Sequence, residues 1–445
     1  MKLLLILPDA KMHKLKIGRY VCSFREAPLT LTTLAALTPG DVHVRFVDGS
    51  IEPIPLDYPA DLVGISVLTG TSLRAYEISR HFRSRGIPVV MGGVHVTIMK
   101  EEARQHADTI VLGMAERIWP VIIADFKNGK MKDVYFDEGW PPDDILGGVP
   151  SPRIDLLRRH RYAVPDTVQA TRGCKHKCDF CSVSSVWPRY YKRPVPDVIR
   201  DIERLPGKRI AFNDVSLVDD LDYAKELFKA MIPLKRKWGG LATTLVGRDN
   251  ELLDLMQKSG CVYLLLGLES SNQRILRDIH KGFNKDDDYD ELMRNLHERG
   301  ISVQGCFVFG FDEDDRTVFK DTVQRVLDLQ IDIPRYSIYT PYPGTALFKR
   351  MKSENRILSD NWDNYDTMHV VFQPAKMSPE ELYAGFKWAY RETFRFSNIL
   401  KRTVLQSRTS PLINFVGNLA YRIFVKRLYN EERFRFPYTE YRPLF

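Results

Sequence analysis

The chain has 445 residues, 44% of them hydrophobic and 27% charged, with a formal net charge of +8 and six cysteines. This length accommodates about two or three domains with substantial cores, and so few cysteines, three of them crowded together, exclude the disulfide framework of a small secreted protein. Residues 391–445 carry eleven Lys or Arg and four Asp or Glu, so most of the net charge lies in this tail. The nearly neutral remainder argues against a nucleic-acid groove over the body of the protein.

The first ten residues, MKLLLILPDA, are apolar for only a few positions before Pro8 and Asp9. This run is too short for a spanning helix and has no flanking signal-peptide features. We therefore expect a cytoplasmic protein whose first strand is buried.

The first 130 residues alternate short apolar runs with amphipathic segments. The strand candidates are residues 3–7, 42–47, 62–66, 88–93 and 109–113. Their nearly continuous Val, Ile and Leu are typical of parallel strands buried on both faces. We predict a doubly wound, Rossmann-like sheet that binds its ligand at the carboxyl ends of the strands. The loops there are rich in small residues, although glycines after strands are ordinary turn residues at least as often as ligand contacts.

A second series of strands follows an irregular segment. Residues 131–165 are rich in Pro, Gly and Asp and are predicted to be a linker. Six strand candidates come next, at residues 167–172, 209–214, 241–246, 262–267, 302–310 and 335–340. Strands that alternate with helical stretches predict a partial (β/α)6 barrel of TIM type over residues 166–350, with its chemistry on the loops after the strands.

Three cysteines lie within eight residues on the loop after the first of these strands. Cys174, Cys178 and Cys181 have the spacing C-x3-C-x2-C. Thiolates hold Zn²⁺ with a fourth protein ligand, and His176 is a candidate for that position, although structural zinc sites usually combine two cysteine pairs. Three thiolates on one loop instead suit three corners of a [4Fe–4S] cubane, whose fourth iron stays open to a small molecule.

The cysteine motif CKHKCDFC, with an aromatic residue before its last cysteine, resembles that of the radical S-adenosylmethionine (SAM) enzymes. In that family SAM fills the open iron position and is cleaved to a 5′-deoxyadenosyl radical. The segments IAFNDVSL, LLLGLES, GCFVFGFDED and TPYPGT resemble further parts of the family's barrel, with Cys306 where the pattern usually has glycine. The resemblance implies SAM contacts from Phe180, Asn213, Asp214, Glu269, Gly310 and Glu313.

The domain order resembles a subgroup with an N-terminal cobalamin-binding domain, and this resemblance runs over most of residues 1–395. The subgroup includes methylases of polycyclic isoprenoid lipids and an oxidative cyclase of porphyrin esters. It implies cobalamin contacts from Ser66, Thr69, Gly92, Gly93, His95, Gly113 and Glu116. The chain has no D-x-H-x-x-G motif, since Phe46 stands where that motif has glycine. We therefore expect cobalamin without a protein imidazole ligand, or alternatively a domain kept as a structural relic.

Residues 351–445 are predicted to be a mostly helical region with a basic amphipathic tail. Apolar residues recur there at helical spacing, at Leu412, Phe415, Val416, Leu419, Ile423 and Phe424. We favour a helix that covers the open side of the barrel. Contact with the inner face of an anionic membrane is the alternative.

Several single residues have ordinary structural interpretations. Cys22, Cys261 and Cys306 each stand alone and are expected to be small buried hydrophobes. Tyr339 is expected to be a core tyrosine, and His176 a solvent-facing spacer within the cysteine loop.

The resemblance implies a radical SAM enzyme that methylates an unactivated carbon of a hydrophobic, lipid- or isoprenoid-like substrate. The expected cofactors are a [4Fe–4S] cluster, SAM and cobalamin, and the expected partner is an electron donor such as flavodoxin or ferredoxin. Cyclisation, oxidation or rearrangement without methyl transfer is one alternative, and a non-catalytic cobalamin or metal sensor is another. Methylthiolation would need a second cysteine trio near the N-terminus, where only Cys22 is present.

Overall fold

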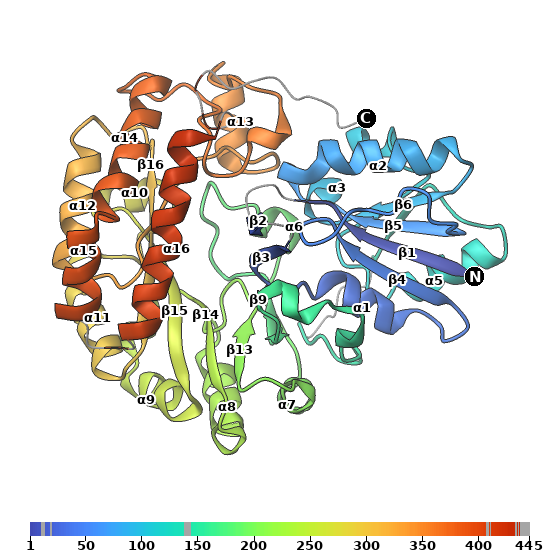
Figure 1. The fold of residues 1–445 in the computed structure, drawn as a ribbon, viewed down its shortest axis with the longest axis horizontal. Helices are drawn as coiled ribbons and strands as arrows, with labels where there is room; N and C mark the ends of the chain where they lie inside the picture. Colours follow the sequence, from blue (N-terminus) through green and yellow to red (C-terminus); the bar gives the residue numbers. More distant parts are fainter. Residues whose placement is uncertain are drawn as a thin grey trace. The chain divides into compact units, whose positions relative to one another are not determined.

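The computed structural model describes residues 1–9, 14–17, 20–137, 144–405, 409, 411–431, 434 and 436. The chain folds into two compact units (Figure 1). The first contains Met1–Gly173 and Ser182–Asn213, and the second contains Cys174–Cys181 and the described residues from Asp214 onward. Among the helices that the structure describes, none combines the length and the apolar character that crossing a membrane requires.

The first unit is built on a six-stranded, fully parallel sheet. Its strands are β1 (Lys2–Leu7), β4 (His43–Asp48), β5 (Leu62–Ser66), β6 (Val89–Gly92), β7 (Thr109–Leu112) and β8 (Val134–Phe136). They pair in the order β4-β1-β5-β6-β7-β8. All five strands predicted for this region are present. β8 lies in the segment predicted as a linker, where its three residues are too short for a periodic signal.

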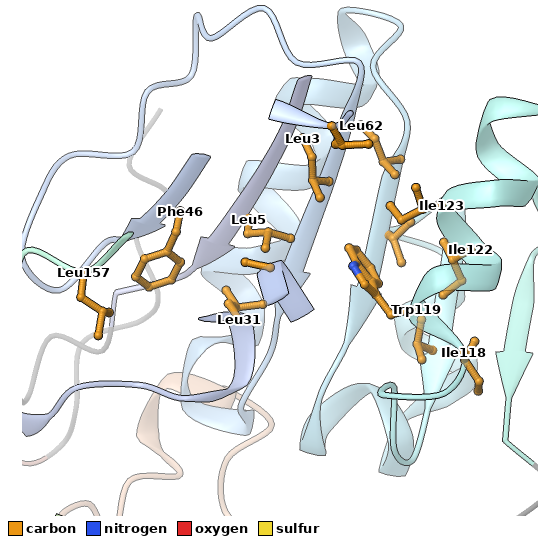
Figure 2. Close-up of a cluster of buried hydrophobic side chains, with 14 of the residues drawn as sticks. Leu3, Leu5, Leu31, Phe46, Leu62, Ile118, Trp119, Ile122, Ile123 and Leu157 are labelled. Atoms are coloured by element: carbon orange, nitrogen blue, oxygen red, sulfur yellow. The ribbon is translucent and has the colours of Figure 1, made fainter. Parts of the chain in front are cut away.

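Helices cover both faces of this sheet, which explains its unbroken apolar strands. They are α1 (Thr30–Leu37), α2 (Ser72–Ser84), α3 (Val94–Ile98), α4 (Lys100–Arg104) and α5 (Trp119–Lys127). Leu3 and Leu5 of β1 pack with Leu31 of α1 and Trp119 of α5 (Figure 2). The intervening residues of β1 point to the opposite face and pack against α2. The prediction of a doubly wound sheet is confirmed, because alternate residues of one strand enter two separate cores.

Two smaller sheets complete the first unit. Strands β2 (Lys14–Ile17), β3 (Tyr20–Glu26) and β9 (Tyr162–Val164) form one, and β11 (Thr171–Arg172) pairs with β12 (Tyr191–Lys192) in the other. In addition, β10 (Thr167–Val168) pairs in parallel with β13 (Arg209–Phe212). The strand predicted over residues 167–172 is therefore two short strands, and the antiparallel pairing of the second leads into the cysteine loop.

The second unit contains four parallel strands that pair in chain order. They are β14 (Lys237–Ala242), β15 (Cys261–Glu269), β16 (Ser302–Phe309) and β17 (Arg335–Ile338). The helices that follow β13 to β16 are α8 (Leu221–Met231), α9 (Asn250–Ser259), α10 (Gln273–Asp278), α11 (Tyr289–Glu298) and α12 (Val318–Asp328). β14 begins four residues before the predicted strand, because its Gly239 and Gly240 weaken the strand signal. The fold class, a mixed α/β protein with parallel sheets and a helical C-terminal region, is confirmed.

The C-terminal helices are α13 (Ala346–Ser353), α14 (Pro379–Thr393), α15 (Phe396–Leu400) and α16 (Pro411–Asn430), and α16 runs beside α14 (Figure 1). Two buried side chains fix α16 to the segment before β17: Asn414 Nδ2 donates to Asp332 Oδ1 at 2.6 Å, and Asn418 Nδ2 donates to the Asp332 carbonyl at 2.8 Å. The described part of the basic tail therefore has a packing role.

Candidate functional site

The cysteine loop begins at a backbone turn that requires glycine. Gly173 has φ +85°, and a Cβ at this position would overlap the carbonyl oxygen of Arg189. A side chain here would meet backbone that cannot rotate away, and an L-residue is strained at this φ. Gly173 therefore sets the direction in which the chain enters the loop that carries Cys174.

Four segments distant in sequence hold the loop in the second unit. The backbone N–H of Lys175 donates to Asp219 Oδ2 at 3.0 Å. Around Asp179, the Asp179 N–H donates to the Ile279 carbonyl at 3.2 Å, and the Leu347 N–H donates to the Asp179 carbonyl at 3.1 Å. The Tyr339 hydroxyl donates to Asp179 Oδ2 at 2.7 Å. Tyr339 was predicted to be a core tyrosine; it is buried, but its hydroxyl anchors the loop.

The three thiols are partly exposed, and none is in a disulfide. Burial raises the pKa of Cys178 to about 12 and raises the pKa of Cys174 as well. Thiolate is the form that binds metal, so loading the loop must release protons. In the described chain, no three Cys, His, Asp or Glu side chains converge on one point where a single metal ion would sit. Cubane thiolates each bind a different iron and need no such convergence, so this donor set fits a [4Fe–4S] cluster.

His176 is not the solvent-facing spacer that the sequence predicts. Its ring stacks on Phe283 at 4.0 Å between centroids, and its Nε2 lies 3.7 Å from Asp219 Oδ1. Burial lowers the pKa of His176. These neighbours give the ring a role in packing the loop and offer no support for its use as a zinc ligand.

A buried ion pair lies beside the cysteine loop. Glu269, the last residue of β15, has φ +65°, and its Oε1 is 2.5 Å from Lys281 Nζ. Burial disfavours the charged lysine, but Glu269, Cys178 and Cys181 outweigh it and raise the pKa of Lys281. Lys281 therefore supplies a positive charge next to two of the thiols. The sequence analysis did not single out Lys281, because a lysine followed by glycine after a short helix belongs to no hydrophobic repeat or known motif.

The other predicted SAM contacts occupy several different environments. Asn213 and Asp214 directly follow β13, and Asp214 is buried. Gly310 follows β16 with φ +99°, and its N–H donates to Asp314 Oδ2 at 2.9 Å. Glu313 forms ion pairs with Lys376 and Arg274 at the surface. A SAM contact from each of them stays a prediction.

Phe180 lies within the cysteine loop, and its ring meets that of Tyr339 edge to face, with 5.9 Å between centroids. Cys306, predicted as a small buried hydrophobe, is instead partly exposed on β16, whereas Cys261 is buried as expected. Cys306 and Val308 are partly exposed, whereas Phe307 and Phe309, on the opposite face of the strand, are buried.

The predicted cobalamin residues of the first unit gather at the carboxyl edge of its sheet. β5, β6 and β7 are adjacent and parallel, so Ser66, Gly92 and Gly113 end neighbouring strands or follow them directly. Gly93 has φ +110°, and a Cβ there would overlap the backbone of Val67. Ligands of doubly wound sheets bind at this edge, and the small residues there would let a large flat cofactor approach the backbone. Cobalamin contacts from these residues stay a prediction.

His95 is completely buried at this edge, and protein groups surround both ring nitrogens. Its Nδ1 lies 3.4 Å from Thr69 Oγ1, and its Nε2 lies 3.0 Å from the Tyr76 hydroxyl. The Tyr76 hydroxyl donates to Glu102 Oε1 at 2.9 Å, so Nε2 of His95 is the donor toward Tyr76. This network positions the loop after β5, whereas direct contact between His95 and cobalamin stays a prediction. Glu116 forms an ion pair with Arg172 at 2.6 Å.

Comparison with known proteins decides the family. Three family models match: the B12 binding domain over residues 27–123, the Radical SAM superfamily over residues 168–325, and a domain of unknown function (DUF4070) over residues 345–414. The bacteriochlorophyllide d C-12(1)-methyltransferase of Chlorobaculum tepidum is 32% identical over 90% of this chain and 89% of its own length. The chain belongs to the cobalamin-binding radical SAM enzymes.

Other known proteins match as well. The bacteriochlorophyllide d C-8(2)-methyltransferase of the same organism is 28% identical over 88% of this chain and 91% of its own length. The hopanoid C-2 methylase of Rhodopseudomonas palustris is 23% identical over 75% of this chain and 66% of its own length. The solved structure of the cobalamin-dependent SAM radical enzyme OxsB has a TM-score of 0.66 at 14% identity, covering 98% of this chain and 73% of OxsB, a likeness that shows the fold.

The predictions of a radical SAM enzyme and of its cofactors are confirmed by these matches. A cobalamin-binding radical SAM enzyme uses a [4Fe–4S] cluster, SAM and cobalamin. The alternatives of a non-catalytic sensor and of a relic N-terminal domain are therefore set aside. Methyltransferases are among the relatives that match over most of the chain.

Proposed function

We propose that the protein methylates an unactivated carbon of a hydrophobic, polycyclic small molecule. The observation that carries the proposal is that both bacteriochlorophyllide methyltransferases match along nearly the whole chain, across both predicted cofactor regions. Their names favour a tetrapyrrole over the isoprenoid lipid that the sequence suggested. The hopanoid methylase, at lower identity, keeps a polycyclic lipid as the second candidate.

The bound cofactors would supply a radical that removes hydrogen from carbon, together with the methyl group that replaces it. The chain's own contribution is to hold the reactants. Cys174, Cys178 and Cys181 would bind the cluster, and Tyr339, through Asp179, fixes the loop that presents them. Buried Lys281 and Glu269 place one positive and one negative charge beside these thiols, where they can orient a charged cofactor such as SAM.

The electron that starts each turnover would come from an external donor such as a flavodoxin or a ferredoxin. Reduction of the cluster from outside needs no further redox group in this chain. Dithionite replaces such a donor in the test below.

The test is anaerobic and measures two products. The cluster is reconstituted, hydroxocobalamin, dithionite, SAM and bacteriochlorophyllide d are added, and 5′-deoxyadenosine and S-adenosylhomocysteine are measured by mass spectrometry. A methylase is expected to form both, with S-adenosylhomocysteine dependent on cobalamin and the tetrapyrrole gaining 14 mass units per methyl group.

Two variants are compared. Cys178→Ala removes a predicted cluster ligand, and Cys261→Ala is its control, because Cys261 is a buried cysteine outside the loop. Only the first is expected to stop 5′-deoxyadenosine formation. 5′-Deoxyadenosine without S-adenosylhomocysteine would contradict methyl transfer and favour cyclisation, oxidation or rearrangement.

A further inference from the structure

Arg335 is the first residue of β17, and its side chain points to the same side of the strand as that of Tyr339, which holds the cysteine loop through Asp179. Successive residues of a strand point to opposite faces. Tyr336 and Ile338 are buried, and the Tyr336 hydroxyl lies 2.7 Å from Thr393 Oγ1 on α14. Arg335 and Tyr339 therefore share the opposite, inner face, where Tyr339 meets Asp179.

The neighbours of Arg335 on this inner face include no carboxylate that pairs with it. Cys306 of β16 is its partner in the parallel register. The groups that raise the pKa of Arg335 against the lowering effect of burial are Tyr421, Cys306, Tyr390 and Tyr263. Among the described residues no hydrogen bond or ion pair to the guanidinium is found, and no carboxylate is among the groups that affect its pKa. A partly buried arginine without a counter-ion is unusual, because a guanidinium taken from water normally keeps an anionic partner.

A second donor lies beside it. The Tyr263 hydroxyl donates to Gln304 Oε1, and Gln304 Nε2 donates to the Tyr421 hydroxyl oxygen at 2.6 Å. This chain of bonds uses Tyr421 as an acceptor and leaves its O–H proton with no acceptor among the described residues. Tyr421 is on α16, so the helix that packs over this unit also delivers a donor next to Arg335.

Two apolar side chains share the inner face with Arg335. Leu265 of β15 and Val308 of β16 are partly exposed on this face, as the alternation of burial along both strands shows. The one nearby carboxylate that affects Cys306 is Glu269, which is already paired with Lys281. The face therefore combines apolar side chains with one positive charge that no described carboxylate neutralises.

We propose that Arg335 and Tyr421 bind a carboxylate of the substrate, so that this enzyme acts on a hydrophobic carboxylic acid. A guanidinium and a hydroxyl match the two oxygens of a carboxylate, and the nearby Leu265 and Val308 match the apolar body of such a molecule. This inference rests on the proposed function and deepens it by naming the substrate class. SAM also carries a carboxylate. However, Cys178 and Cys181 affect the pKa of Lys281 and are not among the groups that affect the pKa of Arg335, so Lys281 is the cation beside the cysteine loop.

The test compares an acid with its ester in full-length protein carrying its cluster and cobalamin. Binding of protoporphyrin IX and of its dimethyl ester is measured by equilibrium dialysis, and binding of SAM is measured in parallel. The variants are Arg335→Met, Arg335→Lys and Tyr421→Phe, with Arg294→Met as the matched control because Arg294 is exposed on α11. No turnover is measured, so a failure of the methylation proposal would not affect the result.

Wild type is expected to bind the acid about 10- to 100-fold more tightly than the ester, the range for a charge-assisted hydrogen bond. Arg335→Met should abolish this preference, Arg335→Lys should keep part of it, and Tyr421→Phe should reduce it. SAM affinity and the Arg294→Met variant should be unchanged. Equal binding of acid and ester to wild type would overturn the proposal, as would a loss of SAM affinity as large as the loss of acid affinity. If Arg335→Met does not fold, an unchanged acid preference in both Arg335→Lys and Tyr421→Phe would overturn it as well.

Discussion

The Tyr339 hydroxyl donates a 2.7 Å hydrogen bond to Oδ2 of Asp179, in the middle of the loop that carries the three cysteines. The other carboxylate oxygen of Asp179 is buried and has no hydrogen-bond partner among the described residues. Burial raises the pKa of Asp179, and the Tyr339 hydrogen bond opposes that rise. One hydroxyl group at the end of β17 therefore stabilises both a buried carboxylate and the position of the loop.

Tyr339→Phe should lower the free energy of unfolding by about 1–3 kcal/mol, because the mutation leaves the Asp179 carboxylate buried without its donor. It should also slow 5′-deoxyadenosine formation, because the cysteine loop loses an anchor. The control is Tyr336→Phe, which removes a hydroxyl from the opposite face of the same strand. We expect that control to lose stability, measured by urea unfolding, and to keep its rate of SAM cleavage. Equal rates in the two variants would show that the Tyr339 bond is only structural.

Gly173→Ala should displace the cysteine loop, because the new Cβ would overlap the carbonyl of Arg189 at a φ that L-residues avoid. The expected result is a protein that retains less iron than wild type after anaerobic reconstitution and gel filtration. Gly86→Ala is the matched control, since Gly86 also has positive φ but nothing lies within 4 Å of its added Cβ. Full iron retention in Gly173→Ala would contradict the prediction.

Lys281→Met should be strongly destabilising. It leaves the Glu269 carboxylate buried without its cation, which typically costs about 3–5 kcal/mol. The double variant Glu269→Gln/Lys281→Met removes both charges and should recover most of that loss in urea unfolding of the cluster-free protein. The single variant Glu269→Gln is measured as well. If the losses of unfolding free energy in Lys281→Met and Glu269→Gln add up to the loss in the double variant, the ion pair does not couple the two residues.

Iron loading should depend on pH through the thiols. Burial raises the pKa of Cys174 and Cys178 above the ordinary value, so both are protonated at neutral pH and must lose their protons to bind iron. Iron affinity should therefore rise with pH between about 6.5 and 8.5, with at least two protons released per cluster. The measurement is a set of calorimetric titrations in buffers of different ionisation enthalpy. Cys178→Ala should release one proton fewer, and an affinity independent of pH would contradict the assignment of these thiols as ligands.

The sheet of the first unit was predictable because its physics is local in sequence. β1 is buried on both faces, so every residue from Leu3 to Ile6 must be apolar, and such a run is visible without knowledge of its partners. β8 and the sheet formed by β2, β3 and β9 were missed, because short or edge strands bury too few residues to leave a period.

By itself, the sequence determined the order of strands and helices, the cysteine trio and, through resemblance, the family and its cofactors. These features depend on residue type and spacing along the chain. Only the tertiary structure decided that Tyr339 anchors the cysteine loop and that Lys281 pairs with Glu269. It also decided that Arg335 lies beside Tyr421 with no counter-ion among the residues that the structure describes. Each of these facts depends on how the folded chain places its strands, loops and helices, which brings together residues from 12 to 160 positions apart. The free energies that matter here are those of burying side chains and of burying charges without a partner. A sequence does not show which charges will be buried without one.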